Sequence, residues 1–508
     1  MNKTAELALG IDVGTGATKA VLAYIDGKVL WHASSSYEYK RPKLDYAEQD
    51  PQDWWNAICK VTGHLFQEHP EARKRVTAVA LSGQGVAAIL LDGRGQVLRP
   101  AILWPDRRCA QDAEDLQIIH GEKIVSISGK LPASYNFEPK LRWIQRHEPA
   151  VWSRCWKAFT TTSLMTFRLT GCPVMNHSDG GILLAYDLAA RTWSSEVQGL
   201  LELPDEVYCD LVNCDTVVGR ITDWAESETG IPRGVPVLAG GEDTSCAGLA
   251  MGAITSSTGQ LSLGTANTVN VPMKRAVIHP KLLAFPHVVP DCTLIGGSLS
   301  SGGLAVRWLG KIFDGDGGDS GSVTSEQLTV QATAIPPGSD GLLFLPYLAG
   351  ELQPVNDGFA RGVFFGLTSE IGRAHLLRAV LEGNAFAIEH NLSLARTVGA
   401  APQELAAVGG PARNRLLCQI IADVTGLDIR VMEENGGAAL GSAILAAHGT
   451  QMSSFSAMQK AHARVRELYR PNPEQQRAYR KVFERYLALG SRVKDLYPRP
   501  DREESALW

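Results

Sequence analysis

The first hundred residues alternate between apolar and polar positions in the way that is typical of a strand-rich sheet with tight turns. The turn pairs Asp26-Gly27 and Asp92-Gly93 favour hairpins. Apolar residues at helical spacing after Pro51 predict a helix that ends near residue 68. The predicted strands cover residues 7–12, 17–25, 29–39, 76–82 and 86–91. This order of strands and helix predicts a mixed sheet with hairpins and not a chain of βαβ units.

The pattern then becomes mainly helical between residues 112 and 203, before a short apolar strand at residues 235–239. Beyond residue 252 the strand-rich plan returns, which predicts a duplicated α/β unit. A Gly/Asp/Ser-rich stretch at residues 315–325 predicts a flexible surface loop. The further predicted elements are strands within residues 260–272, 342–345 and 405–408, and helices at residues 244–250, 302–313, 373–398 and 474–496.

Length and composition narrow the class of protein. A chain of 508 residues is too long for one ordinary core. We therefore expect two domains, residues 1–251 and residues 252–508. The net charge is −5 and no basic run occurs, so we expect no nucleic-acid partner. The apolar stretches are too short to span a bilayer, and no secretory signal is recognisable at the N-terminus. Nine scattered cysteines without a CxxC pair favour reduced thiols in a cytoplasmic protein.

The same short phrase occurs twice and is the strongest clue to function. Residues 10–19 read Gly-Ile-Asp-Val-Gly-Thr-Gly-Ala-Thr-Lys, and residues 261–268 read Leu-Ser-Leu-Gly-Thr-Ala-Asn-Thr. Each is an apolar strand followed by Gly-Thr, a small residue and further alternation. Two such elbows could face each other and offer backbone N–H groups to a polyphosphate. A single elbow could equally be an ordinary glycine-rich hairpin, because short glycine motifs are weak signals.

Two acidic residues stand at strand ends. Asp12 precedes the first elbow, where it could anchor Mg²⁺ through water or simply cap its own turn. Asp243 follows a strand and two glycines and begins a helix of small residues. It could act as a general base toward a substrate hydroxyl. The plainer interpretation of Asp243 is a helix N-cap, which is the commonest role of Asp at such a position.

Two more segments could form parts of the same site. Gly409-Gly410 leads from a predicted strand into a helix and could flank a nucleotide, although a simple turn before Pro411 would explain it as well. Trp104 is followed closely by Asp106 and Arg107, a combination that suits a sugar. A surface salt bridge between Asp106 and Arg107 is an equally good explanation.

Taken together, these motifs resemble the FGGY family of carbohydrate kinases over nearly the whole chain. Both signature segments of that family are recognisable, and within it the chain is most similar to bacterial xylulose kinases. The segments that carry the resemblance are residues 48–55, 102–106, 139–144, 344–351, 362–367 and 375–382. The resemblance implies an α/β fold with two ribonuclease-H-like domains, of the actin and hexokinase type, that flank a catalytic cleft.

The resemblance also implies roles for individual residues. Asp243 would be the catalytic base and Asp12 the acid linked to Mg²⁺. The first elbow would contact the phosphates of ATP through Thr15, Gly16 and Lys19. The other implied nucleotide-binding residues are Gly264, Thr265, Gly303, Arg307, Gly410 and Asn414. The implied sugar-binding residues are Gln84, Gly85, Val86, Trp104, Asp106 and Asp243.

Three departures from the xylulose-kinase pattern concern the acceptor. Met-His of that branch is replaced by Gly85-Val86, the Glu-Arg-Thr-Pro segment reads Glu-Leu-Gln-Pro from Glu351, and the Asn after the base is Thr244. Polar contacts decide which hydroxyls a pocket accepts. We expect an ATP-dependent kinase of a ketopentose such as D-xylulose.

Other acceptors stay open, namely another ketose, a polyol such as erythritol or glycerol, or a sugar acid. Two alternatives of another class are a non-catalytic nucleotide- and sugar-binding sensor and an ATPase resembling Hsp70. A homodimer is also left open.

Overall fold

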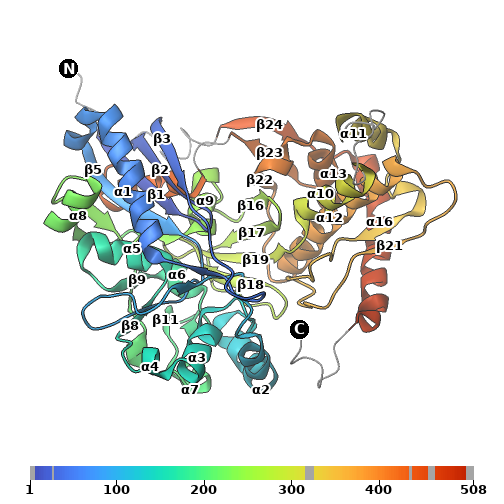
Figure 1. The fold of residues 1–508 in the computed structure, drawn as a ribbon. Helices are drawn as coiled ribbons and strands as arrows, with labels where there is room; N and C mark the ends of the chain where they lie inside the picture. The colour runs from blue at the N-terminus through green and yellow to red at the C-terminus, as the bar shows by residue number, and fades with distance from the viewer. Residues whose placement is uncertain (1–5, 26–27, 315–324, 434–436, 456–463, 499–508) are drawn as a thin grey trace.

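The computed structural model describes residues 6–25, 28–314, 325–433, 437–455 and 464–498. Its architecture is two seven-stranded mixed sheets with helices packed around them (Figure 1). The first sheet contains β1 (Leu7–Val13), β2 (Ala17–Tyr24), β3 (Val29–Ser36), β5 (Val76–Gly83), β13 (Val217–Arg220), β14 (Pro236–Leu238) and β15 (Gly241–Glu242). The second contains β16 (Thr258–Leu263), β17 (Asn267–Met273), β18 (Leu283–Pro286), β19 (Thr293–Leu299), β22 (Glu404–Val408), β23 (Asp428–Met432) and β24 (Val465–Tyr469).

The two sheets share one plan, so the predicted duplication is confirmed. In the first sheet β1, β2 and β3 run antiparallel to their neighbours, and β5 joins β1 in parallel. In the second sheet β16, β17 and β19 are antiparallel neighbours, and β22 joins β16 in parallel. Each elbow of the sequence therefore connects the first two strands of one copy of the unit.

Most helices cover the faces of these sheets. The larger ones are α1 (Pro51–Glu68), α2 (Ala110–Ser128), α3 (Phe137–His147), α5 (Thr161–Thr170), α9 (Asp243–Met251), α10 (Gly302–Asp314), α11 (Ser325–Ala334), α12 (Arg373–Thr397), α13 (Arg415–Thr425), α14 (Gly437–Gly449) and α16 (Pro473–Val493). The shorter ones are α4 (Pro149–Trp152), α6 (His177–Gly181), α7 (Ser195–Leu201) and α8 (Asp223–Thr229). No helix of the described segments is long and apolar enough to cross a membrane.

Helix α1 shows how closely local sequence can specify an element. Asp50 is the N-cap and accepts a hydrogen bond from the N–H of Gln52, and Pro51 occupies the first turn. The apolar residues predicted to share one face are all buried against the first core. Helix α16 likewise buries one face, with Tyr479, Tyr486 and Leu489 buried.

Several predicted boundaries are wrong. The strand expected at residues 86–91 begins only at Ile89 (β6, Ile89–Leu91), because Val86 has a φ of +53° and sits in a turn. The region expected to be mainly helical also contains β8 (Lys157–Phe159), β9 (Val174–Asn176), β10 (Tyr186–Asp187), β11 (Thr192–Trp193) and β12 (Asp210–Val212). The turn at Asp26-Gly27 and residues 315–324 of the expected loop lie outside the described residues, and Ser325 begins α11.

Helix α14 packs against the first sheet although it follows the second sheet in sequence. Its alanine-rich faces contact β1, β5 and α9 and form a buried cluster with Ala8, Val21 and Ala80. The approach to α9 is so close that a Cβ at Gly441 would lie 1.8 Å from the carbonyl oxygen of Cys246. Residues on both sides of the predicted domain boundary at residue 251 therefore pack together in one buried cluster.

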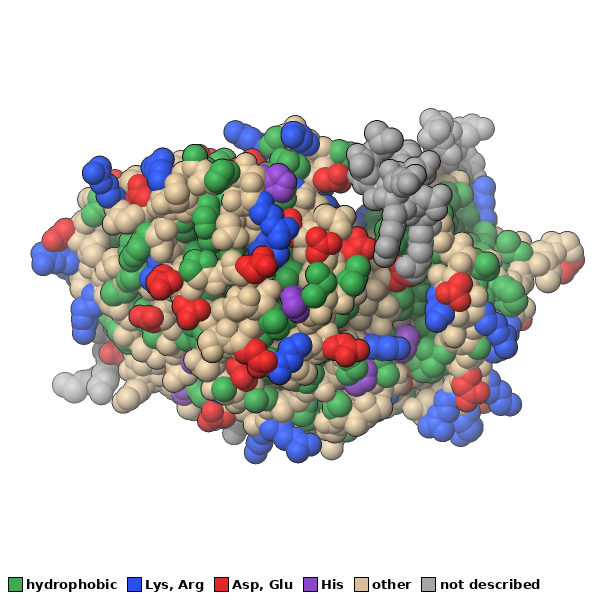
Figure 2. Space-filling view, turned by 90° about the horizontal axis from the view of Figure 1, so that it is seen from below, with side chains coloured by type: hydrophobic (Ala, Val, Ile, Leu, Met, Phe, Trp, Pro, Cys, Tyr) green, Lys and Arg blue, Asp and Glu red, His purple; other side chains and the backbone are tan. Residues whose placement is uncertain are grey.

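Charges on the surface are mixed. On the face drawn in Figure 2, side chains of Lys and Arg are interspersed with those of Asp and Glu. That distribution agrees with the small net charge of −5. This face therefore offers no single-sign surface to a polyelectrolyte.

Candidate active site

Three strands of the first sheet end at one edge and bring two carboxylates together. Asp12 of β1 lies opposite Ser82 of β5, which in turn pairs with Gly241 of β15. The Oγ of Ser82 donates a hydrogen bond to Oδ1 of Asp12 at 3.0 Å. Asp243 follows β15 directly, so the two predicted catalytic acids are neighbours at the carboxyl ends of parallel strands.

Asp243 is the first residue of α9 and is not its N-cap. The N-cap is Glu242, whose Oε2 accepts a hydrogen bond from the N–H of Ser245 at 2.9 Å. The capping role considered for Asp243 is therefore wrong. The Asp243 carboxylate instead accepts a hydrogen bond from the hydroxyl of Thr244 at 3.1 Å and keeps part of its surface exposed.

Electrostatics make both acids unusually basic. Burial raises the pKa of Asp243 well above its ordinary value, and the neighbouring carboxylate of Glu242 raises it further. Burial also raises the pKa of Asp12 to about 6, with a further rise from Asp243, while Lys19 and the Ser82 hydroxyl act in the opposite direction. A carboxylate with a raised pKa accepts a proton from an alcohol more readily.

The first elbow contacts the predicted sugar-binding residues. The Thr15 hydroxyl donates to Oε1 of Gln84 at 3.0 Å and accepts from Nε1 of Trp104 at 3.1 Å. Thr15, expected to face phosphate, thus has its hydroxyl bound to two residues expected to face sugar. Gly16 and Lys19 are exposed, and Lys19 lies opposite Asp12 in the β1–β2 pair.

A glutamine that the sequence analysis missed supports this network. Gln49 accepts from Gln84 at 3.1 Å and from the indole N–H of Trp54 at 2.9 Å, and donates to the carbonyl oxygen of Thr15 at 2.8 Å. The only signal in the sequence was a polar residue shortly before Trp54-Trp55; in the structure Gln49 is almost fully buried, where an amide needs hydrogen-bond partners. Gln49 fixes the orientation of the Gln84 amide.

Two predicted sugar-binding residues lie beside this network in different settings. Gly85 follows Gln84 and is half-buried, whereas Val86 is buried and its carbonyl oxygen accepts from Nζ of Lys140 at 2.6 Å. The positive φ of Val86 is a strained conformation for a β-branched residue. The Lys140 contact holds this turn in place.

The Asp106 carboxylate is occupied by hydrogen bonds within the protein. One of its oxygens accepts from the backbone N–H of Ala47 at 2.5 Å, and both accept from the guanidinium of Arg108 at 2.9 Å. The salt bridge considered for Asp106 therefore forms with Arg108 and not with Arg107. Both oxygens of the Asp106 carboxylate are therefore already hydrogen-bonded to residues other than Trp104.

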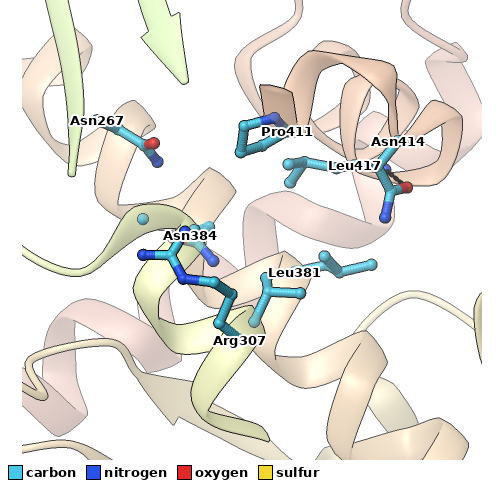
Figure 3. A pocket seen from close by; sticks show the side chains of 10 residues that line it. Asn267, Arg307, Leu381, Asn384, Pro411, Asn414 and Leu417 are labelled. Atoms are coloured by element: carbon cyan, nitrogen blue, oxygen red, sulfur yellow. Dashed lines mark hydrogen bonds between the residues drawn. The ribbon is translucent and has the colours of Figure 1, made fainter. Parts of the chain in front are cut away.

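A cavity of about 150 Å³ lies beside the second sheet (Figure 3). Of the predicted nucleotide-binding residues, Gly303, Arg307 and Asn414 line it. In Figure 3 the polar ends of Asn267, Arg307 and Asn384 gather on one side, opposite Pro411 and Leu417. The full lining is Asn267, Gly302, Gly303, Val306, Arg307, Leu381, Asn384, Pro411, Asn414 and Leu417.

The second elbow adjoins this cavity. The N–H of Gly303 donates to the carbonyl oxygen of Gly264 at 2.8 Å, and Nη2 of Arg307 donates to the Thr265 hydroxyl at 2.9 Å. Gly410, in contrast, lies in a short 3₁₀ turn (Gly410–Arg413) next to Pro411 and does not line the cavity. The asparagine amides and apolar walls suit an aromatic base with polar edges and a ribose.

The cavity residues that the sequence analysis missed come from distant elements. Asn267 opens β17, while Leu381 and Asn384 lie on the long helix α12. Asn384 is buried on α12, as are Arg378, Glu382 and Asn391 of the same helix, and a buried amide needs hydrogen-bond partners. Nothing in the local sequence indicates that Leu381 faces a cavity.

Comparisons with known proteins match both halves of the chain to one family. Residues 7–250 match the family model described as the N-terminal domain of the FGGY family of carbohydrate kinases, and residues 259–450 match the C-terminal domain. A curated xylulose kinase of Staphylococcus epidermidis is 30% identical over 495 residues, which cover 97% of this chain and 98% of that protein.

Solved structures share the whole architecture. A xylulose kinase from Rhodospirillum rubrum superimposes with a TM-score of 0.92 at 30% identity, covering 97% of this chain and all of the other. A gluconate kinase from Lactobacillus acidophilus reaches a TM-score of 0.91 at 26% identity, covering 97% and 99%. The predicted two-domain α/β fold is thereby confirmed.

Proposed function

The chain belongs to the FGGY family of carbohydrate kinases, and from that premise we propose that it phosphorylates a ketopentose. The chain is an enzyme that transfers a phosphoryl group from ATP to a sugar. Its similarity to xylulose kinases supports D-xylulose as the acceptor, and we propose that the product is xylulose 5-phosphate. We also propose that residues 1–251 bind most of the sugar and residues 252–508 most of the nucleotide.

In this proposal Asp243 is the general base. Its raised pKa and its partial exposure at the end of β15 support the role, because a base must reach the hydroxyl and be basic enough to take its proton. Thr244 orients the carboxylate through its hydroxyl. Gln84 and Trp104 position the sugar. The side-chain amide nitrogen of Gln84 donates one hydrogen bond to Gln49, so its second N–H remains available to a sugar hydroxyl.

The cavity of the second sheet takes the adenosine part of ATP. Gly264 and Thr265 lead from it toward the phosphates, with Arg307 held by Thr265. Positioning and charge stabilisation supply most of the rate in phosphoryl transfer. The exposed Lys19 and the backbone N–H groups around Gly16 are the donors that we assign to the transferred group.

We also propose Mg²⁺ as the metal that accompanies ATP. Asp12 fits that ion, since Mg²⁺ is usually held by one or two carboxylates together with phosphates and water. Ser82 bonds only one oxygen of Asp12, which leaves Oδ2 available. Among the described residues no group of three His, Cys, Asp or Glu side chains could hold an ion by itself. Bound Mg²⁺ neutralises charge on the phosphates.

The observation that carries the proposal is the position of Asp243 at the start of α9 with its capping role taken by Glu242. We expect Asp243→Ala to lower turnover about 100- to 10,000-fold and to leave the Kd for ADP unchanged. Asp223→Ala is the matched control, because Asp223 is also the first residue of a helix but is exposed and forms a surface ion pair with Arg233. ADP release with a panel of ketoses, polyols and sugar acids measures both variants.

The same panel also tests whether gluconate, glycerol or a related compound is the acceptor. The similarity to a gluconate kinase supports testing that sugar acid beside D-xylulose. A sensor without catalysis would bind sugar and ATP and release no ADP with any acceptor. Near-normal turnover of Asp243→Ala would contradict the assigned base.

A further inference from the structure

Asparagine side chains line the cavity beside the second sheet, and two of them already use their oxygens within the protein (Figure 3). Oδ1 of Asn267 accepts from the N–H of Gly264 at 3.3 Å, and Oδ1 of Asn414 accepts from the N–H of Leu417 at 3.0 Å. The polar group that each has not engaged in these bonds is its amide nitrogen, which is a donor. Arg307, the charged residue of the lining, likewise has only donors.

The third asparagine, Asn384, presents its oxygen instead. Its Nδ2 donates to the carbonyl oxygen of Val380, one turn earlier on α12, at 3.1 Å. A carbonyl oxygen can only accept, so this bond fixes which end of the Asn384 amide is nitrogen and which is oxygen. Among the described side chains of the lining, Asn384 therefore supplies the amide oxygen for which the structure shows no donor.

An asparagine one turn and a half further along α12 shows what is particular about Asn384. Nδ2 of Asn391 donates to Ala387 at 3.2 Å in the same way, and its Oδ1 also has no partner among the described residues. Oδ1 of Asn391 is fully enclosed, however, and Asn391 does not line the cavity. Oδ1 of Asn384 is not enclosed in this way, and its side chain lines the cavity.

Asn384 belongs to the buried part of the cavity. Only 3% of its surface is exposed, and Leu381, three residues earlier on the same face of α12, is fully buried. Arg307 is exposed and donates to the Thr265 hydroxyl of the second elbow at 2.9 Å. Because the elbow is the proposed site of the phosphates, the base is the part of the nucleotide that enters the buried end beside Asn384.

A free acceptor at this place distinguishes between purine bases. Ribose hydroxyls can donate or accept, so the amide nitrogens of Asn267 and Asn414 can bind them. The exocyclic amine of adenine only donates and therefore needs an acceptor. A base with a carbonyl oxygen at that position, such as hypoxanthine or guanine, places two acceptors against each other and leaves the buried Asn384 oxygen unpaired, which is unfavourable.

Resting on the proposed nucleotide site of this kinase, we propose that Asn384 is a specificity-determining residue for the phosphoryl donor. Its Oδ1 accepts a hydrogen bond from the 6-amino group of adenine. Adenine nucleotides are then preferred to those of inosine and guanosine. The apolar lining residues Val306, Leu381 and Leu417 contribute contact area that does not tell one purine from another.

The test compares ADP with IDP, which has a carbonyl oxygen in place of the 6-amino group, and with 2′-deoxy-ADP. Isothermal titration calorimetry gives the Kd of each for the wild type, Asn384→Ala and Asn391→Ala. Asn391→Ala is the matched control, because it removes a buried amide with the same kind of bond from the same helix outside the cavity. Kinetics with ATP and ITP at a saturating sugar concentration repeat the comparison during turnover.

We expect the wild type to bind ADP about 5- to 150-fold more tightly than IDP, the factor for leaving a buried acceptor unpaired. In Asn384→Ala this preference falls to about one- to threefold, because the acceptor is gone. The ratio between ADP and 2′-deoxy-ADP stays as in the wild type. Asn391→Ala keeps both wild-type ratios.

An unchanged preference for ADP over IDP in folded Asn384→Ala overturns the inference and leaves the kinase function standing. A change confined to the 2′-deoxy-ADP ratio also overturns it, since Oδ1 then binds the ribose, and so does an equal loss of affinity for ADP and IDP, which marks a general effect on α12. A wild type that binds IDP as tightly as ADP refutes it without any variant. If the wild type binds no ADP at all, the proposed nucleotide site fails, and the inference fails with it.

Discussion

Replacing Gly303 by alanine tests whether the cavity beside the second elbow binds the nucleotide. Gly303 stands in the first turn of α10, and its N–H donates to the carbonyl oxygen of Gly264 at 2.8 Å. An added Cβ would lie 2.5 Å from that same oxygen and 3.2 Å from Cγ of Pro411. One methyl group therefore collides with the elbow on one side of the cavity and with its wall on the other.

The size of the effect follows from this geometry. Ordinary van der Waals contact begins near 3.4 Å, so the Cβ is about 0.9 Å too close to Gly264. The obstructing oxygen belongs to the backbone, so relief requires movement of the elbow or of α10 as a whole. Overpacking of this kind typically costs about 1–3 kcal/mol. If binding of the nucleotide needs the undistorted elbow, the Kd for ADP rises about 5- to 150-fold.

Isothermal titration calorimetry with ADP measures that change, and thermal unfolding without ligand measures stability separately. Gly310→Ala is the control within the same helix, because a Cβ there meets no atom within 4 Å. It should leave the Kd unchanged and stabilise the helix by at most about 1 kcal/mol. Binding of the sugar, followed by thermal shift, should be the same in both variants.

The reasoning is refuted if folded Gly303→Ala binds ADP within twofold of the wild type. A loss of ADP affinity in Gly310→Ala of the same size would also refute it, since the effect would then not come from the collision.

Two further predictions concern the sugar side and the pH dependence of stability. Trp104→Ala should raise the KM for the acceptor about 3- to 10-fold and leave the Kd for ADP unchanged, because the exposed indole of Trp104 lies outside the nucleotide cavity and bonds to Thr15. Burial raises the pKa of Glu351 to about 7, so the folded protein keeps this proton longer than the unfolded chain does, and stability falls as pH rises from about 4.5 to 7. Glu351→Gln should therefore have a Tm roughly 1–3 °C above the wild type at pH 8, and differential scanning calorimetry should find that gap absent near pH 4.5. A gap of equal size at both pH values would contradict the assignment to Glu351.

Capping residues and apolar spacing in the sequence predicted those helices whose ends are set by residues close by in the chain. Helix α1 is an example, since Asp50 and Pro51 specify its start and apolar spacing specifies its buried face. Helix α16 is another, since Asn472 caps its first turn and Pro473 opens it. In these cases the hydrogen bonds and the packing face are set within one or two turns of helix, so the sequence contains the necessary information.

Features that depend on distant partners could not be predicted. Glu242 takes the cap that Asp243 was considered for, because pairing of β15 with β5 sets the backbone one residue earlier. Val86 leaves the strand pattern since Lys140, more than fifty residues away, binds its carbonyl oxygen. The cavity needs Asn384 from α12, whose inward position is decided by tertiary packing.

The packing of α14 on the first sheet has a consequence for how the protein is made. During synthesis the strands of that sheet leave the ribosome long before residues 437–449 are translated. At ordinary translation speeds the 185 residues between positions 251 and 437 take roughly 10 to 40 s. Until then Ala8, Val21 and Ala80 are not covered by α14, so the packing of the amino-terminal half is completed only after most strands of the second sheet have been translated.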